Sequence, residues 1–151
     1  MELNKAKEKT GELMVKYGLF QNGWVFKIDR AIRRLGCCIE GRKEIHLSQH
    51  FIELNDDAEI KDTILHEIAH ALVGGINHHN HVWQSMAINI GCRPNRCNND
   101  AQIPKGKWSA QCSGCQKILH RYRFSAGMKR QSLICACRTG DTLVWKVNEW
   151  E

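Results

Sequence analysis

The sequence predicts an α+β protein with two parts: a small sheet packed on one long helix, followed by a smaller β-rich part. Three observations support this prediction. Apolar residues recur at helical spacing over 60–72, two short stretches at 24–29 and 43–48 alternate apolar and polar residues, and the last third contains two cysteine pairs. At 151 residues, the chain is long enough for one modest core and an appendage, but too short for two ordinary domains.

The composition is typical of a folded protein. Hydrophobic residues make up 42% of the chain and charged residues 25%, which argues against disorder throughout. Residues 1–9 are rich in charge and lack the apolar core of a signal peptide, and no apolar run approaches the roughly 18 residues of a membrane span. We therefore expect a monomer without membrane association that is not secreted. It would stay in the cytoplasm or near the nucleoid, or in the host cytoplasm if it is viral.

Residues 1–100 are predicted to form the larger part. Near the N-terminus, apolar residues spaced along a Lys- and Glu-rich segment predict an amphipathic helix that ends near Gly18. The stretches 24–29 and 43–48 then predict two or three strands of a small sheet.

The longest predicted helix begins after Asp56. Asp56 is suited to cap this helix, Glu59 stands at its third position, and apolar residues follow at helical spacing until Gly74. A second helix is predicted over 82–90, and the polar stretch 95–107 predicts a linker. Residues 101–151 would then form the β-rich part.

The long helix carries a His-Glu-x-x-His motif. His66 and His70 are four residues apart, so both imidazoles lie on one helical face and can bind the same Zn²⁺. Glu67 can take a proton from water that zinc has acidified, which makes it the candidate catalytic base. This pattern predicts a zinc-dependent hydrolase, because the motif lies on a capped amphipathic helix.

A catalytic zinc site needs a third protein ligand and one open position. Three histidines follow the glycine turn at the end of the long helix, where a chain reversal can return one of them to the motif. Spacing alone does not choose among His78, His79 and His81.

Four segments together resemble the SprT-like metallopeptidase family, which includes the Spartan proteases. The resemblance extends over about residues 12–147, and its most specific part is the helix with its flanks. The matching segments are Leu35-Gly36-Cys37, Ile45-His46-Leu47-Ser48, Asp62 through Gly74, and His79 through Trp83. A further stretch, 91–97, is similar to small bacterial or viral members.

The resemblance implies a zincin-like catalytic domain and a role for His79. In the family, a His-Gly-x-x-Trp/Phe element follows the motif helix, and its histidine is the third zinc ligand. His79 and Trp83 have this spacing, although Asn80 stands where the family usually has glycine. This departure leaves His81 and His78 as alternative ligands.

The cysteine pairs of the C-terminal part predict a structural zinc site. Cys112 and Cys115 are separated by two residues, Cys135 and Cys137 by one, and the two pairs lie at a distance suited to two knuckles closing on one ion. His120 is an alternative to one member of the second pair. Many members of the SprT-like family, which this chain resembles, carry such a C-terminal zinc ribbon. The remaining cysteines are predicted to be small buried residues, with a third metal site as the alternative: Cys37, Cys38, Cys92 and Cys97.

The net charge is confined to the C-terminal part. Residues 1–100 hold 13 basic and 13 acidic residues, whereas residues 101–151 hold nine basic and three acidic ones, which accounts for the whole net charge of +6. Such a basic ribbon predicts contacts with DNA, single-stranded or with single-stranded character. A solvated basic hairpin is the alternative. The candidate DNA-binding residues are Arg121, Arg123, Lys129 and Arg130, interleaved with Tyr122 and Phe124.

These features lead to one main functional hypothesis and two alternatives. The main hypothesis is a zinc endopeptidase of the SprT-like type, with one catalytic and one structural zinc ion. Its protein substrates would be associated with DNA, which the resemblance implies and the composition does not. One alternative is a nucleic-acid-binding ribbon protein whose His-Glu-x-x-His site is structural or weakly active. The other is zinc-assisted hydrolysis of a non-peptide bond.

Overall fold

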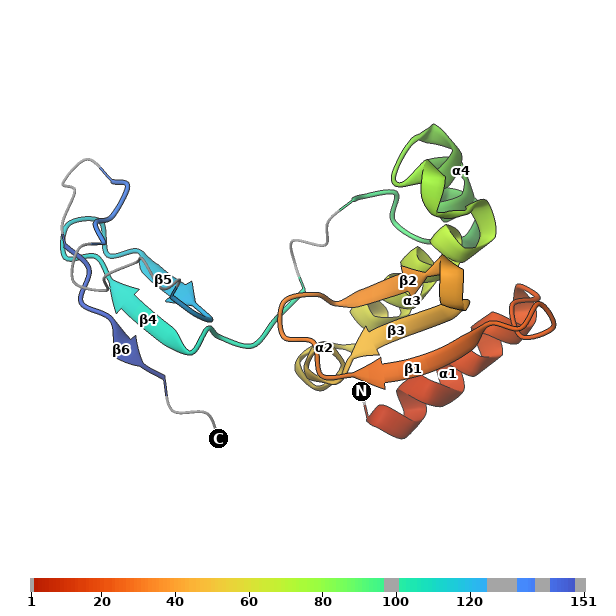
Figure 1. The fold of residues 1–151 in the computed structure, drawn as a ribbon, viewed down its shortest axis with the longest axis horizontal. Coiled ribbons are helices and arrows are strands. Elements are labelled where there is room, and N and C mark those ends of the chain that lie inside the picture. Colours follow the sequence, from red (N-terminus) through yellow and green to blue (C-terminus); the bar gives the residue numbers. More distant parts are fainter. Residues whose placement is uncertain (1, 97–100, 125–132, 138–141, 149–151) are drawn as a thin grey trace. The chain divides into compact units, whose positions relative to one another are not determined.

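The structure is a computed structural model, and it describes residues 2–96, 101–124, 133–137 and 142–148. The predicted α+β class is confirmed, because helices and two small sheets share the chain. The chain forms two compact units, Met1–Pro104 and Lys105–Glu151 (Figure 1). None of the described helices is long and apolar enough to cross a lipid bilayer.

The sheet of the first unit has three strands in the order β1-β3-β2. The strands are β1 (Val25–Asp29), β2 (Gly36–Ile39) and β3 (Glu44–Ser48), and the 3₁₀ turn η1 (Glu40–Arg42) joins the last two. The central strand β3 runs parallel to β1 and antiparallel to β2. Its buried Ile45 and Leu47 alternate with Glu44 and His46, so the polar pair occupies the other face of the sheet.

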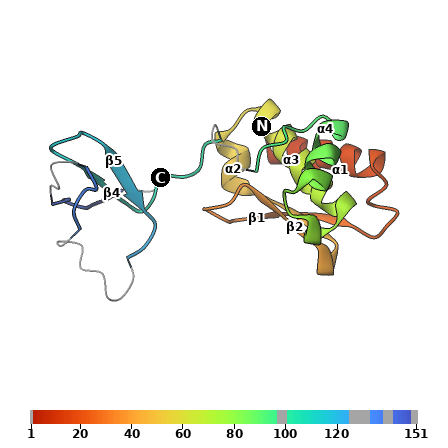
Figure 2. The same cartoon turned by 90° about the horizontal axis from the view of Figure 1, so that it is seen from above.

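The helices lie on one face of this sheet, as Figure 2 shows. The elements are α1 (Leu3–Lys16), α2 (Gln49–Leu54), α3 (Asp57–Val73), the 3₁₀ turn η2 (Gly75–Asn77) and α4 (His81–Ile90). Helix α3 packs against α1, α4 and the sheet, and it supplies Ile60, Ile64 and Ile68 to the core with no exposed surface. The core therefore holds α3 in place from several sides.

Both predicted ends of α3 are present. The Asp56 side chain caps the helix by accepting a hydrogen bond from the Glu59 N–H at 2.9 Å. At the other end, Gly74 leaves the helix with a φ of 82°, a conformation that residues with a Cβ rarely adopt. Helix α4 ends at Gly91, which also has a positive φ, of 83°, but adopts the left-handed helical conformation. The sheet has three strands, within the predicted two or three, but the apolar pattern did not locate β2, and helix α2 was not predicted.

The second unit contains a small antiparallel sheet in the order β5-β4-β6. The strands are β4 (Trp108–Gln111), β5 (Ile118–Arg121) and β6 (Lys146–Val147). A tight turn between β4 and β5 includes Gln116, which has a φ of 59° and donates its N–H to the Cys112 carbonyl at 2.9 Å. The unit's small core contains Ala110, Cys112, Cys135 and Leu143.

Candidate metal centre and active site

Helix α3 and the turn after it bring three histidines together. His66 and His70 lie one helical turn apart on α3, and His79 follows the η2 turn. The Nε2 atoms of His66 and His79 are 3.0 Å apart, and those of His70 and His79 are 3.1 Å apart. The exposed His78 and His81 are not part of this group. The structure thus places His79, rather than either alternative, beside the motif.

The three nitrogen atoms fit the space around one metal ion. Zinc–nitrogen bonds of about 2.0–2.1 Å in a tetrahedron place the nitrogens about 3.3 Å apart, close to the separations in this group. Burial is the main cause that lowers the pKa of His66 to about 4, and the positive charges of His70 and His79 contribute to the same shift. Burial is also the main cause that lowers the pKa of His70 to about 4. Neutral imidazoles are the form that binds a metal, so this environment suits zinc.

The Trp83 ring packs against all three imidazoles. It lies on α4 with no exposed surface, and its ring centroid is 4.6 Å from those of His66 and His79 and 5.2 Å from that of His70. Asn80 begins this helix: its side chain accepts hydrogen bonds from the N–H groups of Val82 and Trp83. The residue that departs from the family pattern therefore acts as a helix cap.

Glu67 is buried next to the histidines. Its side chain is only 7% exposed, and burial raises its pKa to about 8, against the opposing effects of the Arg34 charge and a hydrogen bond from the Cys38 backbone N–H. Strand β2 thus holds this carboxyl group from the sheet side. The strand approaches closely because Gly36 has no side chain: a Cβ there would lie 3.1 Å from Glu67 Cγ and 2.9 Å from the His46 carbonyl oxygen.

A cleft of about 590 Å³ gives access to this group from outside. His66 and Glu67 are part of its wall, together with Asp62 and with two arginines from each of two segments, between β1 and β2 and after α4: Arg33, Arg34, Arg93 and Arg96. Arg93 is anchored to α3 by ion pairs with Glu59 at 2.7 Å and Asp62 at 3.0 Å. Sequence reasoning gave Gly36, Cys38 and these arginines no role beside the motif, because the folded chain, and not local spacing, brings them there.

The four predicted cysteines of the second unit also come together. Their sulfur atoms all lie within 4.8 Å of one another, with 3.6 Å between Cys112 and Cys137 and 3.7 Å between Cys115 and Cys135. Four zinc–sulfur bonds of about 2.3 Å in a tetrahedron place the sulfurs about 3.8 Å apart. The group therefore suits zinc, and the exposed His120 on β5 is not part of it.

Two of the candidate DNA-binding residues lie in the described part of the second unit. Arg121 is at the end of β5, with its guanidinium 5.7 Å from the centre of the Trp145 ring, and Arg123 is exposed. Phe124 packs edge-on against Trp108 and Trp145, at 5.6 and 5.4 Å between ring centroids, so its ring contributes to packing inside the unit. Lys129 and Arg130 lie outside the described residues, as does Cys97.

An α+β fold whose long helix carries His-Glu-x-x-His, joined by a third histidine from the next turn, is the arrangement of the metallopeptidase class. The chain belongs to the SprT-like family, whose model matches residues 10–102. The predicted family is therefore confirmed, and the matched region contains the complete three-histidine group. No curated protein matches the chain.

Proposed function

We propose that the protein is a zinc-dependent endopeptidase of the SprT-like type. The observation that carries the proposal is the position of Glu67, which is buried and lies in the wall of the cleft together with His66, a member of the three-histidine group. His66, His70 and His79 would hold the catalytic ion. When bound, zinc supplies a Lewis acid that acidifies water and polarises a carbonyl group.

Glu67 is suited to the role of general base. In the metal-free protein burial brings its pKa closer to neutral pH than that of an exposed glutamate, and a general base works best when its pKa lies near the working pH. The Cys38 backbone N–H stabilises the ionised form of this carboxyl group. Glu67 would therefore take the proton from the attacking water and pass it to the leaving amine.

The proposed substrates are proteins associated with DNA. The family resemblance suggests this class, and the charge distribution supports it, because residues 101–151 carry the whole net charge of +6. In this proposal a structural zinc ion at the four cysteines stabilises the second unit. The second unit would bind DNA through Arg121 and Arg123.

The substitution Glu67→Gln tests the catalytic part. It keeps the side-chain volume and removes the base, so we expect zinc content to stay normal while cleavage of a DNA-bound protein slows by about 10²–10⁴-fold. The matched control is Glu12→Gln, which changes an exposed glutamate on α1 and should leave the rate unchanged. Cleavage by Glu67→Gln at the wild-type rate would refute the mechanism.

Metal counting separates this function from a purely DNA-binding role. Zinc should be lost from the histidine group in His66→Ala and from the cysteine group in Cys112→Ser, each without affecting the other. If His66→Ala kept all the zinc of the wild type, the histidines would not be ligands and the peptidase proposal would fail.

A further inference from the structure

The face of the first sheet opposite the helices carries a second cluster of chemically active side chains. Asp29 comes from β1, Cys37 from β2 and His46 from β3, and one potential metal-ligand atom of each lies within 4.8 Å of the other two. Cys37 and His46 are direct partners in the antiparallel pairing of β2 and β3. Side chains alternate between faces along a strand, so Cys37 projects to this face whereas Cys38 packs against the core.

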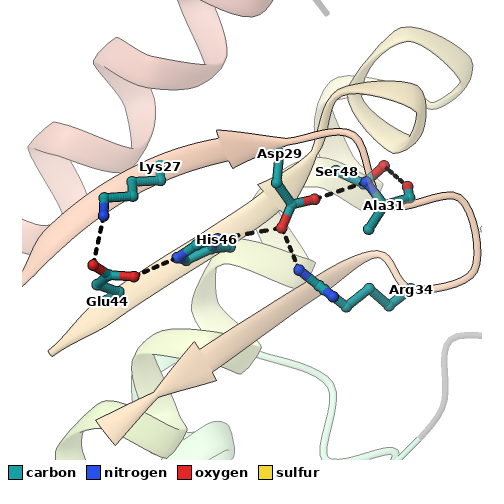
Figure 3. Close-up of polar contacts among 7 residues, drawn as sticks. All are labelled: Lys27, Asp29, Ala31, Arg34, Glu44, His46 and Ser48. Atoms are coloured by element: carbon teal, nitrogen blue, oxygen red, sulfur yellow. Dashed lines mark hydrogen bonds and ion pairs between the residues drawn. The ribbon is translucent and has the colours of Figure 1, made fainter. Parts of the chain in front are cut away.

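Polar contacts hold these side chains in a row across the sheet. Figure 3 shows Lys27, Glu44, His46, Asp29 and Arg34 linked one to the next. The His46 Nδ1 atom is 3.2 Å from Asp29 Oδ2, and its Nε2 atom is 2.8 Å from Glu44 Oε2. Lys27 contacts the other oxygen of Glu44 at 2.5 Å.

The spacing of this row matches a metal site with an outer supporting residue. The 3.2 Å between His46 Nδ1 and Asp29 Oδ2 is nearly the separation in the three-histidine group, and about the 3.3 Å expected of two ligands on one zinc ion. A histidine ligand usually donates its second ring N–H to a carboxylate, which fixes the tautomer. Glu44 is placed to accept that hydrogen bond, and this leaves Nδ1 for the metal.

We propose that Asp29, Cys37 and His46 form a second divalent transition-metal site in the first unit, suited to zinc, with Glu44 as the residue that orients His46. A thiolate, an imidazole and a carboxylate are the donors that zinc accepts, and a water would complete four ligands. The proposal goes beyond the proposed function, because none of these residues belongs to the three-histidine group.

Arg34 occupies the position of the cation in the structure. Its guanidinium pairs with Asp29 Oδ2 and its positive charge acts on the Cys37 thiol, so it places positive charge where the metal would lie. Its side chain is 49% exposed and can leave toward solvent. Zinc and Arg34 therefore compete for the Asp29 carboxylate and the Cys37 sulfur, which predicts that removing the arginine strengthens zinc binding.

Zinc titration of the full chain against a chromophoric chelator tests the site. Wild-type protein should bind one zinc ion more than Cys37→Ser, whereas Cys38→Ala, the matched control on the opposite face, should bind as many as the wild type. Glu44→Gln should weaken this one site by about 10- to 100-fold. Arg34→Gln should strengthen it.

The substitution His66→Ala separates a failure of this second metal site from a failure of the proposed catalytic site. It should lose a different zinc ion and keep the one that Cys37→Ser loses, so either site can fail without the other. If Cys37→Ser does not fold, as judged by circular dichroism, His46→Gln provides the same test. Equal zinc binding by the wild type and by a folded variant at Cys37 or His46 would overturn the proposal.

Discussion

At the scale of single residues, the candidate active site contains groups whose pKa values move in opposite directions. Burial lowers the pKa of His66 and His70 from 6.5 to about 4 and raises that of Glu67 from 4.5 to about 8. Between about pH 4 and 6.5 the unfolded chain binds more protons at the histidines, so the stability of the metal-free protein should rise with pH. Between about pH 4.5 and 8 the folded chain binds more protons at Glu67 than the unfolded chain does, so the contribution of Glu67 to stability falls with pH.

These opposing slopes predict a maximum in the stability of the metal-free protein near pH 6.5, where the histidine contribution ends and the Glu67 contribution still declines. The free energy of unfolding can be measured in urea with chelator present, from the circular dichroism of the helices, which in the described residues all lie in the first unit. Glu67→Gln should abolish the decline above the maximum, whereas the exposed Glu12→Gln should keep it. If the free energy of unfolding of Glu67→Gln still declined above the maximum, the decline would belong to other groups.

At the scale of elements, the approach of strand β2 to helix α3 depends on one glycine. A Cβ at Gly36 would lie 2.9 Å from the His46 carbonyl oxygen and from Leu47 Cδ2, and 3.1 Å from Glu67 Cγ. Gly36→Ala should therefore separate the strand from the helix and cost about 1–3 kcal/mol of stability. Activity should fall further than stability, because Glu67 loses its position.

The matched control for this substitution is Gly41→Ala in the η1 turn, where an added Cβ would meet no atom within 4 Å. Urea denaturation and the cleavage rate measure both variants side by side. Equal effects of the two substitutions would show that the close approach at Gly36 has no special role.

The elements also show which parts of the fold were predictable from sequence. Helix α3 was predictable because its cap at Asp56, its apolar period and its end at Gly74 all agree. Strand β2 was not, because its four residues have no alternating pattern and the strand forms only by pairing with β3. Helix α2 is only six residues long, too short for a periodic signal.

The same distinction applies to the sites. The local spacing of His66 and His70 indicated a shared ligand face, but the choice of His79 depends on the η2 turn, which spacing does not specify. The cluster of Asp29, Cys37 and His46 depends on the register of three strands, so the sequence predicted only small buried cysteines there, with a metal site of unspecified ligands as the alternative.

At the scale of the whole molecule, the separation of charge from the candidate active site leads to a prediction about DNA. Residues 1–100 carry no net charge, so non-specific attraction to phosphates should come from the second unit. Each phosphate contact on single-stranded DNA contributes about 0.7 to the slope of log affinity against log salt concentration. Replacing both Arg121 and Arg123 with alanine should reduce that slope by about 1.4 if each contacts one phosphate.

The matched control for this measurement replaces two lysines of α1 whose side chains reach solvent, Lys5 and Lys9, with alanine, which changes the total charge equally. Because Arg121 also lies over the Trp145 ring, the zinc content of each variant must show that the second unit is intact. The arginine variant alone should show the smaller slope, since counterions are released only where phosphates are contacted. An equal reduction in both variants would mean that net charge, rather than contact by the second unit, governs binding, and the proposed delivery of the peptidase to DNA by these two arginines would be wrong.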